Sequence, residues 1–236
     1  MTAPALVLVA HGSSTPESRD AVASARDRVA AHRPGVAVVL AFIEHDEPRL
    51  SAALGTLPTG PAVLVPYLMA DAFHVRTDLR SAAGNARRAG RPVVVANTLG
   101  EHPRLPDVAR QLLADAGSPG DEAAVLASPG TNDEDANEVI RRLARAIGEQ
   151  RTAPVVAAFA STAAPSLTQA LNSLPPPVAV LRWVLAPGRF AASIARQATD
   201  AGARCTAILG THPVLAEIVW DRYDEAAEAL SRRNES

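Results

Sequence analysis

The sequence contains a single cysteine, Cys205, among 236 residues. One thiol excludes an intramolecular disulfide, a four-cysteine zinc site and a protein-bound iron–sulfur cluster. We interpret Cys205, within the apolar stretch ARCTAIL, as a small structural residue of a strand. Aromatic residues make up only 3% of the chain, so the core must be aliphatic, and no array of rings for stacking on nucleobases is evident.

The chain also lacks a strong net charge and a long apolar run. A formal net charge of −2 creates no global field that would attract nucleic acid or an anionic membrane, so an anionic substrate must be held by locally placed arginines. No apolar run is long enough to span a bilayer, and no basic stretch precedes the apolar N-terminal segment. We expect a soluble, cytoplasmic protein that binds neither nucleic acid nor membranes.

Several catalytic signatures are absent as well. No GxGxxG follows a predicted strand, and GxxxxGK[ST], HExxH and GxSxG do not occur. A serine nucleophile at Ser13 or Ser14 would lack a recognisable triad arrangement. A hydrolase or transferase that uses Ser13 therefore has no supporting spacing.

Short β-branched runs alternate with stretches of helical periodicity. In the first half, this pattern predicts strands over residues 5–10, 36–43, 61–69 and 92–96, and helices over 16–32, 48–57, 76–89 and 103–116. Continuous apolar strands such as PAVLVPYLMA favour a parallel sheet that is covered on both faces. The sequence predicts an α/β protein with doubly wound parallel sheets flanked by helices.

The second half of the sequence repeats the first. VVLAFIEHDEPRLSAALGTLP, from residue 38, aligns without a gap on VVAAFASTAAPSLTQALNSLP, from residue 155. Gly12 in AHGS corresponds to Gly130 in SPGT, and LGEHP from Leu99 corresponds to LGTHP from Leu209. We interpret residues 1–118 and 119–236 as two tandem αβ lobes, because a solenoid would need more and shorter copies.

Positions that differ between the copies are the better functional candidates, because both copies share the requirements of the fold. His102 and His212 occupy the same place in LGxHP, before a proline that can open a helix, and we interpret both as structural loop histidines. Three ionisable residues of the first copy lose their ionisable group in the second: His11, Glu44 and His74 align with or near Pro129, Ser161 and Ala191, respectively.

These three residues lie at or just beyond the carboxyl ends of the first, second and third predicted strands. Because the ends of neighbouring parallel strands meet at one edge of a sheet, we expect them to lie together. Two imidazoles and a carboxylate suit a divalent first-row metal ion with open coordination positions. The same groups also suit proton abstraction near neutral pH.

Each residue taken alone also has a purely structural interpretation. A histidine after a strand is more often a turn residue than a ligand. Glu44 belongs to the acidic stretch EHDEP, in which we interpret His45 and Asp46 as exposed residues without a role. The GSST stretch suits a turn followed by a helix cap.

LVAHGSSTPESRD, AFIEHDEP, VPYLMADAFHVRTDL and LGEHPRL together resemble the sirohydrochlorin chelatase family, class II chelatases that place iron or cobalt into sirohydrochlorin. The resemblance covers essentially the whole chain, since the family includes single-copy and fused two-copy forms. It implies two αβ lobes that face each other across a tetrapyrrole-binding cleft. The family often has GxH where this chain has DAFH, so Asp71 and Ala72 depart from its pattern.

The resemblance also implies residue roles. His11 and His74 match the metal-binding histidines, and Glu44 matches a glutamate found between them in related cobaltochelatases. It implies a catalytic set of His11, Glu44 and His74 in the N-terminal lobe, while the degenerate C-terminal lobe forms the other wall of the cleft. Candidates for binding sirohydrochlorin are Ser13, Arg76 and Arg189, with Arg80 and Arg182 as further arginines suited to its carboxylates.

The resulting hypothesis is insertion of Fe²⁺ or Co²⁺ into sirohydrochlorin, in sirohaem or cobalamin biosynthesis, with the metal as substrate and no organic cofactor. Because the lobes are fused, we expect a monomer. The alternative is a non-catalytic carrier of a tetrapyrrole or metal that uses the same cleft. Glu44 favours the enzyme, because a carrier needs ligands but no proton acceptor.

Overall fold

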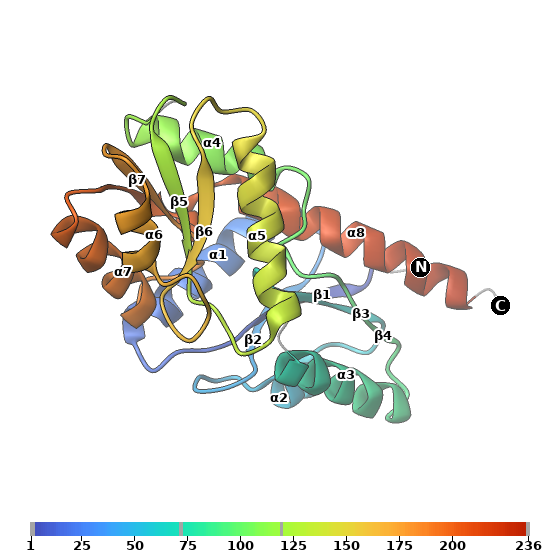
Figure 1. The fold of residues 1–236 in the computed structure, drawn as a ribbon. Helices are drawn as coiled ribbons and strands as arrows, with labels where there is room; N and C mark the ends of the chain where they lie inside the picture. The colour runs from blue at the N-terminus through green and yellow to red at the C-terminus, as the bar shows by residue number, and fades with distance from the viewer. Residues whose placement is uncertain (1–2, 71–72, 119, 235–236) are drawn as a thin grey trace. The chain divides into compact units, whose positions relative to one another are not determined.

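The computed structural model describes residues 3–70, 73–118 and 120–234, with the backbone only for residues 73, 74, 233 and 234. Strands and helices alternate along the described chain (Figure 1). The strands are β1 (Ala5–Ala10), β2 (Val38–Phe42), β3 (Ala62–Pro66), β4 (Val93–Val95), β5 (Ala123–Ser128), β6 (Val155–Phe159), β7 (Val178–Arg182) and β8 (Arg204–Ile208). The helices are α1 (Pro16–His32), α2 (Leu50–Thr56), α3 (Phe73–Arg88), α4 (Leu105–Asp115), α5 (Glu134–Gly148), α6 (Leu167–Ser173), α7 (Arg189–Asp200) and α8 (Val214–Asn234), with a short 3₁₀ helix, η1 (Leu209–Thr211).

The predicted elements of the first half are confirmed. β1 and α1 have the expected bounds, whereas β2 and β3 are shorter than expected and α3 begins three residues earlier, at Phe73. Periodicity marks where an element lies, but its ends depend on local hydrogen bonding. The α/β class predicted from the alternation is therefore correct.

The strands form two parallel sheets of the same topology. Their orders are β2-β1-β3-β4 and β6-β5-β7-β8. The first strand of each copy is central, so its carboxyl end lies between those of the second and third strands. The prediction that His11, Glu44 and His74 lie together requires the first three strands to be neighbours, and this order makes them so.

Helices cover both faces of each sheet, as expected for doubly wound parallel strands. In the first sheet, Val7 and Val9 pack with Leu54 of α2 and Leu79 of α3. Alternate residues such as Leu8 point to the opposite face and are fully buried. The second sheet repeats this arrangement, with α6 and α7 packed on the face that carries Val125 and Val180.

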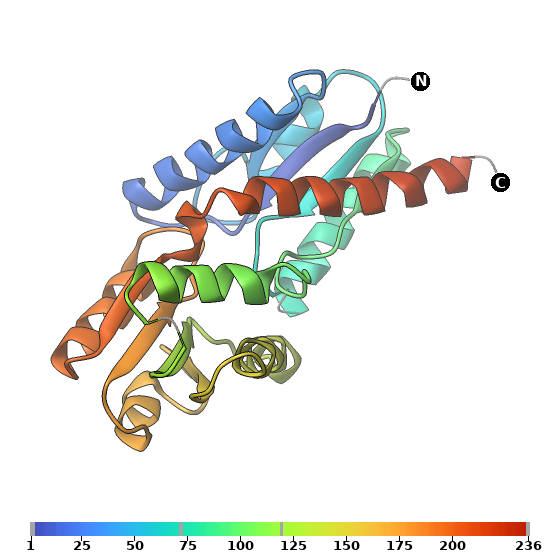
Figure 2. The same ribbon diagram turned by 90° about the horizontal axis from the view of Figure 1, so that it is seen from above.

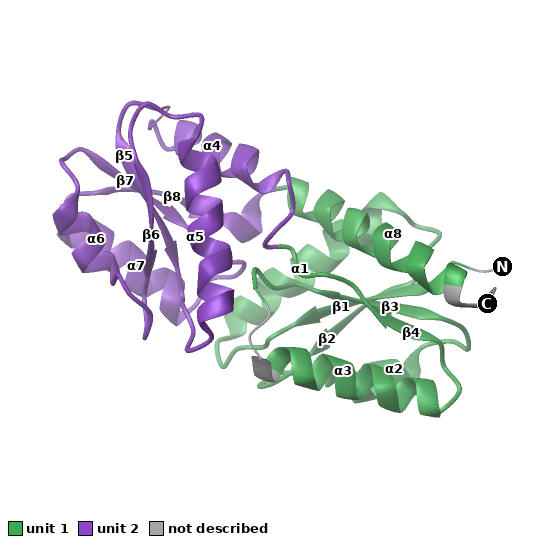
Figure 3. Cartoon of the chain, turned by 45° about the vertical axis from the view of Figure 1, so that its right-hand side comes forward, with its two compact units in different colours: residues 1–99, 213–236 green, residues 100–212 purple. Residues whose placement is uncertain are grey.

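The compact units differ from the two halves predicted from the repeat. Unit 1 consists of residues 1–99 and 213–236, and unit 2 of residues 100–212 (Figure 3). α4 therefore packs in unit 2, against α5, β7 and β8, although it follows β4 of the first copy. α8 packs in unit 1, against α1, β3 and β4; Figure 2 shows it beside α1. The predicted boundary at 118/119 separates the two copies of the sequence repeat, but it does not separate the two compact units. The apolar face of the last helix of each copy can be buried by either sheet, and here each helix packs on the sheet of the other copy.

Specific contacts fasten α8 to unit 1. The indole Nε1 of Trp220 donates a hydrogen bond to the carbonyl oxygen of Val29 at 2.9 Å. Both terminal nitrogens of Arg33 lie 2.7 Å from the carboxylate oxygens of Asp224, and the Arg33 guanidinium lies 4.4 Å from the centre of the Trp220 ring. The Tyr223 hydroxyl donates to the carbonyl oxygen of Pro4 at 2.6 Å. The C-terminal helix is thus an integral part of unit 1.

The repeated LGxHP motif lies at both points where the chain passes from one unit to the other. Unit 1 is interrupted after Leu99, and unit 2 ends at His212. His102 is buried, and its Nδ1 accepts a hydrogen bond from the backbone N–H of Arg104 at 3.3 Å, just before α4. This contact agrees with the structural role predicted for His102.

Two further expectations concern composition. Cys205 lies in β8, partly buried against the core of unit 2, and burial raises the pKa of its thiol. The structural interpretation of Cys205 is consistent with both observations. Among the described helices, none combines the length and apolar character needed to cross a membrane.

Candidate metal site

The site is built where the first three strands end. In the sheet register, Ala10 of β1 is paired with Phe42 of β2, and Val9 is paired with Pro66 of β3. The chain therefore leaves three neighbouring strands at the same edge. This is the edge at which His11, Glu44 and His74 were predicted to meet.

His11 and Glu44 are brought together as predicted. Strand-like pairing continues past β1 and β2, because the N–H of Ile43 donates to the carbonyl of Ala10 at 3.0 Å and the N–H of Glu44 donates to that of His11 at 2.8 Å. His11 is partly exposed, and the Glu44 side chain is 42% exposed. Both groups are therefore held by the sheet and remain accessible to a ligand from solvent.

His74 is the second residue of α3, directly after the loop that follows β3. Its backbone thus lies at the predicted edge. Its side chain, together with Asp71 and Ala72, is outside the described residues. Among the described side chains, which exclude His74, no group of three His, Cys, Asp or Glu residues is arranged to hold a metal ion. A three-residue set of His11, Glu44 and His74 stays a prediction.

His45 is exposed, as expected, and it lies beside both His11 and Glu44. Its ring lies nearly parallel to that of His11, with centroids 6.3 Å apart and an interplanar angle of 13°. Its Nε2 is 3.3 Å from Oε2 of Glu44. The backbone of His45 has φ 63°, and the N–H of Asp46 donates across it to the carbonyl of Glu44 at 2.7 Å, which makes a tight γ-type turn.

Asp46 was expected to be exposed, and that prediction is wrong. The residue is only 7% exposed. Its Oδ2 accepts a hydrogen bond from the N–H of Ser13 at 2.9 Å, and its Oδ1 lies 3.6 Å from Nε of Arg19. The partners of this carboxylate come from the loop after β1 and from α1, so the residues next to Asp46 in the sequence gave no sign of its burial. The copy comparison would have found it, since Ala163 occupies its place in the second copy.

Ser13 and the arginines were predicted to bind substrate. The Ser13 hydroxyl lies 3.1 Å from the hydroxyl of Thr15 and accepts from the N–H of Thr15 at 3.3 Å, so it helps to shape the loop. Thr15 occupies the N-cap position of α1 without a side-chain capping hydrogen bond, contrary to the predicted cap. Arg76 is partly buried on the first turn of α3, and Arg80 is exposed one turn later. Their proposed roles are not tested by these positions.

Tyr67 directly follows β3, and its N–H donates a hydrogen bond to the carbonyl of Val9 in β1 at 2.8 Å. It is 3% exposed, and burial raises the pKa of its hydroxyl to about 12. The group therefore stays protonated over the physiological range and cannot serve as a base there.

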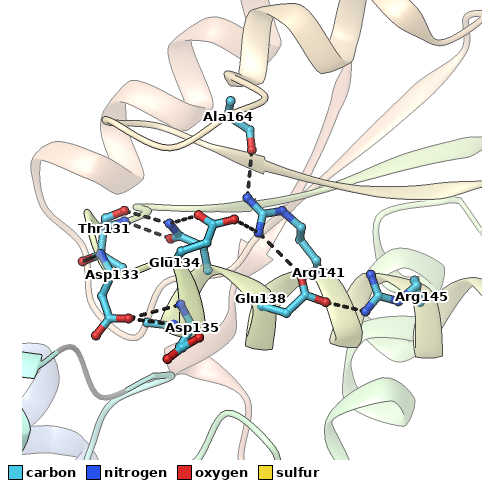
Figure 4. Close-up of polar contacts among 10 residues, drawn as sticks. Thr131, Asp133, Glu134, Asp135, Glu138, Arg141, Arg145 and Ala164 are labelled. Atoms are coloured by element: carbon cyan, nitrogen blue, oxygen red, sulfur yellow. Dashed lines mark hydrogen bonds and ion pairs between the residues drawn. The ribbon is translucent and has the colours of Figure 1, made fainter.

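The second copy uses the equivalent loops differently. The hydroxyl of Ser161, the counterpart of Glu44, donates to the carbonyl of Pro129, the counterpart of His11, at 2.7 Å. Beside them, Arg141 of α5 pairs with Glu134 at 2.6 Å and donates to the carbonyl of Ala164 at 3.2 Å (Figure 4). In the second copy, a neutral hydrogen bond between Ser161 and Pro129 thus replaces the ionisable pair of Glu44 and His11.

The sheet register refines one alignment between the copies. In the first sheet, β3 begins opposite the first residue of β1, and in the second sheet β7 begins opposite the first residue of β5. The following helices, α3 and α7, begin at Phe73 and Arg189, equally many residues after the start of β3 and β7, respectively. The counterpart of His74 is therefore Phe190, directly before Ala191, near which the sequence comparison had placed it. Phe190 is 37% exposed, and the guanidinium of Arg189 lies 5.4 Å from the centre of its ring.

The two arginines of this region have different surroundings. Nε of Arg182, in β7, donates to the carbonyl of Thr206 at 2.6 Å, so the side chain is fixed to β8. Arg189 is the exposed first residue of α7. Arg189 is therefore the better placed of the two to bind an anionic ligand, in line with the sequence analysis.

Comparison with known proteins gives a consistent result. The sequence profile of the CbiX family matches residues 5–116 and 123–226, one match in each copy. No curated protein is recognisably similar to the chain in sequence.

Solved structures share the fold. SirB from Bacillus subtilis with Fe³⁺ is 18% identical, with a TM-score of 0.83, over 95% of this chain and 96% of that one. The sirohydrochlorin chelatase SirB from Bacillus subtilis subspecies spizizenii, in complex with cobalt, is 17% identical, with a TM-score of 0.80 over 96% of both chains. CbiX, the terminal enzyme for siroheme biosynthesis in denitrifying bacteria, is 20% identical, with a TM-score of 0.73, over 94% of this chain and 99% of that one.

At these sequence identities, the similarity to solved structures establishes only the fold. The two matches to the family profile establish that the chain is related to the CbiX family. Both agree with the resemblance found in the sequence motifs and with its fused two-copy form. The chain is thus a member of the CbiX family in which two copies of the family's domain follow one another.

Proposed function

We propose that this protein inserts a divalent metal ion, Fe²⁺ or Co²⁺, into sirohydrochlorin. The observation that carries the proposal is the joining of His11 and Glu44 at neighbouring strand ends, in one copy of the repeat only. A requirement of the fold would act on both copies. Because the accessible imidazole of His11 and carboxylate of Glu44 occur in one copy only, they favour a role in catalysis or metal binding over a structural role.

Metal insertion makes two demands on the protein. It must hold a partly dehydrated cation, and it must accept the two pyrrole protons that the cation replaces. In the proposed site, His11 and His74 are the metal ligands, because neutral imidazole binds Fe²⁺ and Co²⁺ without a permanent charge. Glu44 is accessible to solvent, so it accepts one pyrrole proton, releases it to water and then accepts the second. The charges balance when the cation enters and two protons leave.

The second copy supplies substrate contacts in this proposal. Arg189 pairs with a carboxylate of the tetrapyrrole, and Ser13 and Arg76 contact the substrate from the first copy. The monomeric state and the cytoplasmic location stay predictions.

The solved relatives support this assignment. One SirB structure contains Fe³⁺, another is a sirohydrochlorin chelatase in complex with cobalt, and a CbiX protein is the terminal enzyme of siroheme biosynthesis. Their shared fold and the family profile make the same reaction class the best candidate here.

The alternative is a carrier that binds a metal or tetrapyrrole without catalysis. An enzyme accelerates metal insertion, whereas a carrier does not. The test is therefore to mix purified protein, sirohydrochlorin and Fe²⁺ or Co²⁺ in the absence of oxygen and to follow metal insertion by the visible spectrum. Acceleration over the protein-free mixture, lost in His11→Ala and His74→Ala with unchanged melting temperatures, is expected. Binding of sirohydrochlorin without acceleration would identify a carrier. Near-normal turnover in His11→Ala would show that the metal site is assigned to the wrong residues.

A further inference from the structure

Asp46 is a buried carboxylate that links the two loops of the metal site. It lies in the loop between β2 and α2, and its partners, Ser13 and Arg19, belong to the loop and helix that follow β1. The short contact is the 2.9 Å hydrogen bond from the N–H of Ser13, whereas Arg19 lies farther away, at 3.6 Å. A carboxylate that is 7% exposed needs such partners to offset its desolvation.

The residues between these contacts are the ones that carry the proposed chemistry. Ser13 follows His11 by two positions, and Asp46 follows Glu44 by two. The backbone bond from the N–H of Glu44 to the carbonyl of His11 forms one side of this link, and the Asp46–Ser13 bond forms the other. His45 lies between them with a positive φ, a conformation that a residue other than glycine keeps only when its surroundings enforce it.

The second copy offers an internal comparison. The N–H of Thr131, the counterpart of Ser13, is also satisfied, but by Oδ1 of Asn137 on α5 at 3.0 Å. Asn137 occupies the position of Arg19, and Ala163 that of Asp46. The fold therefore needs an acceptor for this N–H in both copies. Only the copy that carries His11 and Glu44 takes that acceptor from the opposite loop.

We propose that Asp46 is a positioning residue of the metal site, which holds His11 and Glu44 in register by accepting the N–H of Ser13. The inference rests on the proposed function, which identifies the metal as Fe²⁺ or Co²⁺. It assigns a role to Asp46 although this residue is proposed to touch neither the metal nor the tetrapyrrole. Groups that orient metal ligands commonly contribute about 10–100-fold to metal affinity.

The test measures Co²⁺ binding by the intact protein alone, by titration calorimetry and the visible spectrum of the bound ion, beside the melting temperature. Asp46→Ala should weaken Co²⁺ binding about tenfold or more. Asp46→Asn should restore affinity to within about threefold of the wild type, because an amide oxygen can accept the same N–H, as Asn137 does. Asp46→Glu, which keeps the charge but displaces the oxygens, should bind more weakly than Asp46→Asn.

The matched control is Asn137→Ala, which removes the equivalent acceptor from the second copy. It should lower the melting temperature and leave Co²⁺ affinity unchanged. Equal losses in Asn137→Ala and Asp46→Ala would overturn the proposal, as would unchanged affinity in Asp46→Ala. If Asp46→Ala does not fold, the comparison of Asp46→Glu with Asp46→Asn decides, and equal affinities overturn the proposal.

The same measurement separates this inference from the proposed function. If Co²⁺ affinity falls in both His11→Ala and Asp46→Ala but the wild-type protein does not accelerate insertion, the positioning role is retained and the chelatase assignment is lost. If His11→Ala binds Co²⁺ as tightly as the wild-type protein does, His11 is not a ligand of the ion and the positioning role is excluded.

Discussion

Gly12 lies directly against the main-chain carbonyl group of Glu44, so that a Cβ added to Gly12 would lie 1.7 Å from that oxygen. Its φ of 96° is also one that side-chain-bearing residues rarely adopt. The two loops of the site therefore touch through a position that only glycine can fill, next to His11.

We expect Gly12→Ala to force these loops apart. The variant should lose about 1–3 kcal/mol of unfolding free energy from backbone strain alone, and Co²⁺ affinity should fall as His11 and Glu44 separate. Gly55→Ala is the matched control, because Gly55 lies in α2 with open space around its Cα. Urea unfolding and Co²⁺ titration of both variants provide the measurement. Indistinguishable results would contradict the close approach.

Arg189 should contribute to tetrapyrrole binding without affecting the metal. Loss of one partner of a charged hydrogen bond typically costs about 1.5–3 kcal/mol, or roughly tenfold to a hundredfold in affinity. Arg189→Ala should therefore raise the apparent KM for sirohydrochlorin by this factor and leave the KM for the metal unchanged. Arg196→Ala, at an exposed position of the same helix, should change neither constant. An unchanged KM for sirohydrochlorin in Arg189→Ala would remove this residue from the substrate site.

Unit 1 should fold only with its C-terminal helix. A chain of residues 1–118 lacks α8 and exposes the apolar surface of α1, β3 and β4 that this helix covers. A chain in which residues 1–99 are joined through a short Gly/Ser linker to residues 213–236 keeps these contacts, and Nε of Arg222 can still donate to the carbonyl of Thr98. We expect cooperative thermal unfolding of the joined chain but not of residues 1–118. The reverse result would refute the division into units.

Acid should weaken unit 2 through its glutamates. Hydrogen bonding to Arg141 lowers the pKa of Glu134 below its ordinary value of 4.5, and hydrogen bonding to Arg145 does the same for Glu138 (Figure 4). Groups whose pKa is lowered on folding stabilise the folded state above their unfolded pKa, and this contribution disappears as the pH falls through the folded value. Glu134 is exposed and Glu138 is partly exposed, so the effect is small and decreases with added salt.

The measurement is the melting temperature of Glu134→Gln relative to the wild type. A deficit near neutral pH should shrink as the pH falls below 4.5 and vanish below the lowered pKa of Glu134, where both chains carry an uncharged group at this position. Glu228→Gln, at an exposed position of α8, provides the comparison. A deficit of Glu134→Gln that stays constant across this range would show that the ion pair does not contribute.

Much of the molecule could be predicted from patterns that are local in the chain. Apolar periodicity located the strands and helices of the first copy, because burial of one face is a requirement that each element meets with its own residues. The repeat predicted two similar sheets. The position of His11 and Glu44 after neighbouring parallel strands was enough to predict that they meet, since strand ends of one sheet share an edge.

Tertiary structure alone decided the remaining features. The exchange of α4 and α8 between the units is invisible in the repeat, because an apolar helix face does not encode which of two similar sheets will cover it. The buried carboxylate of Asp46 accepts a hydrogen bond from the N–H of Ser13, which lies 33 residues away in the chain, and His45, next to Asp46, adopts a positive φ. Burial and strain of this kind depend on which loops meet in space, so composition, periodicity and spacing along the chain do not determine them.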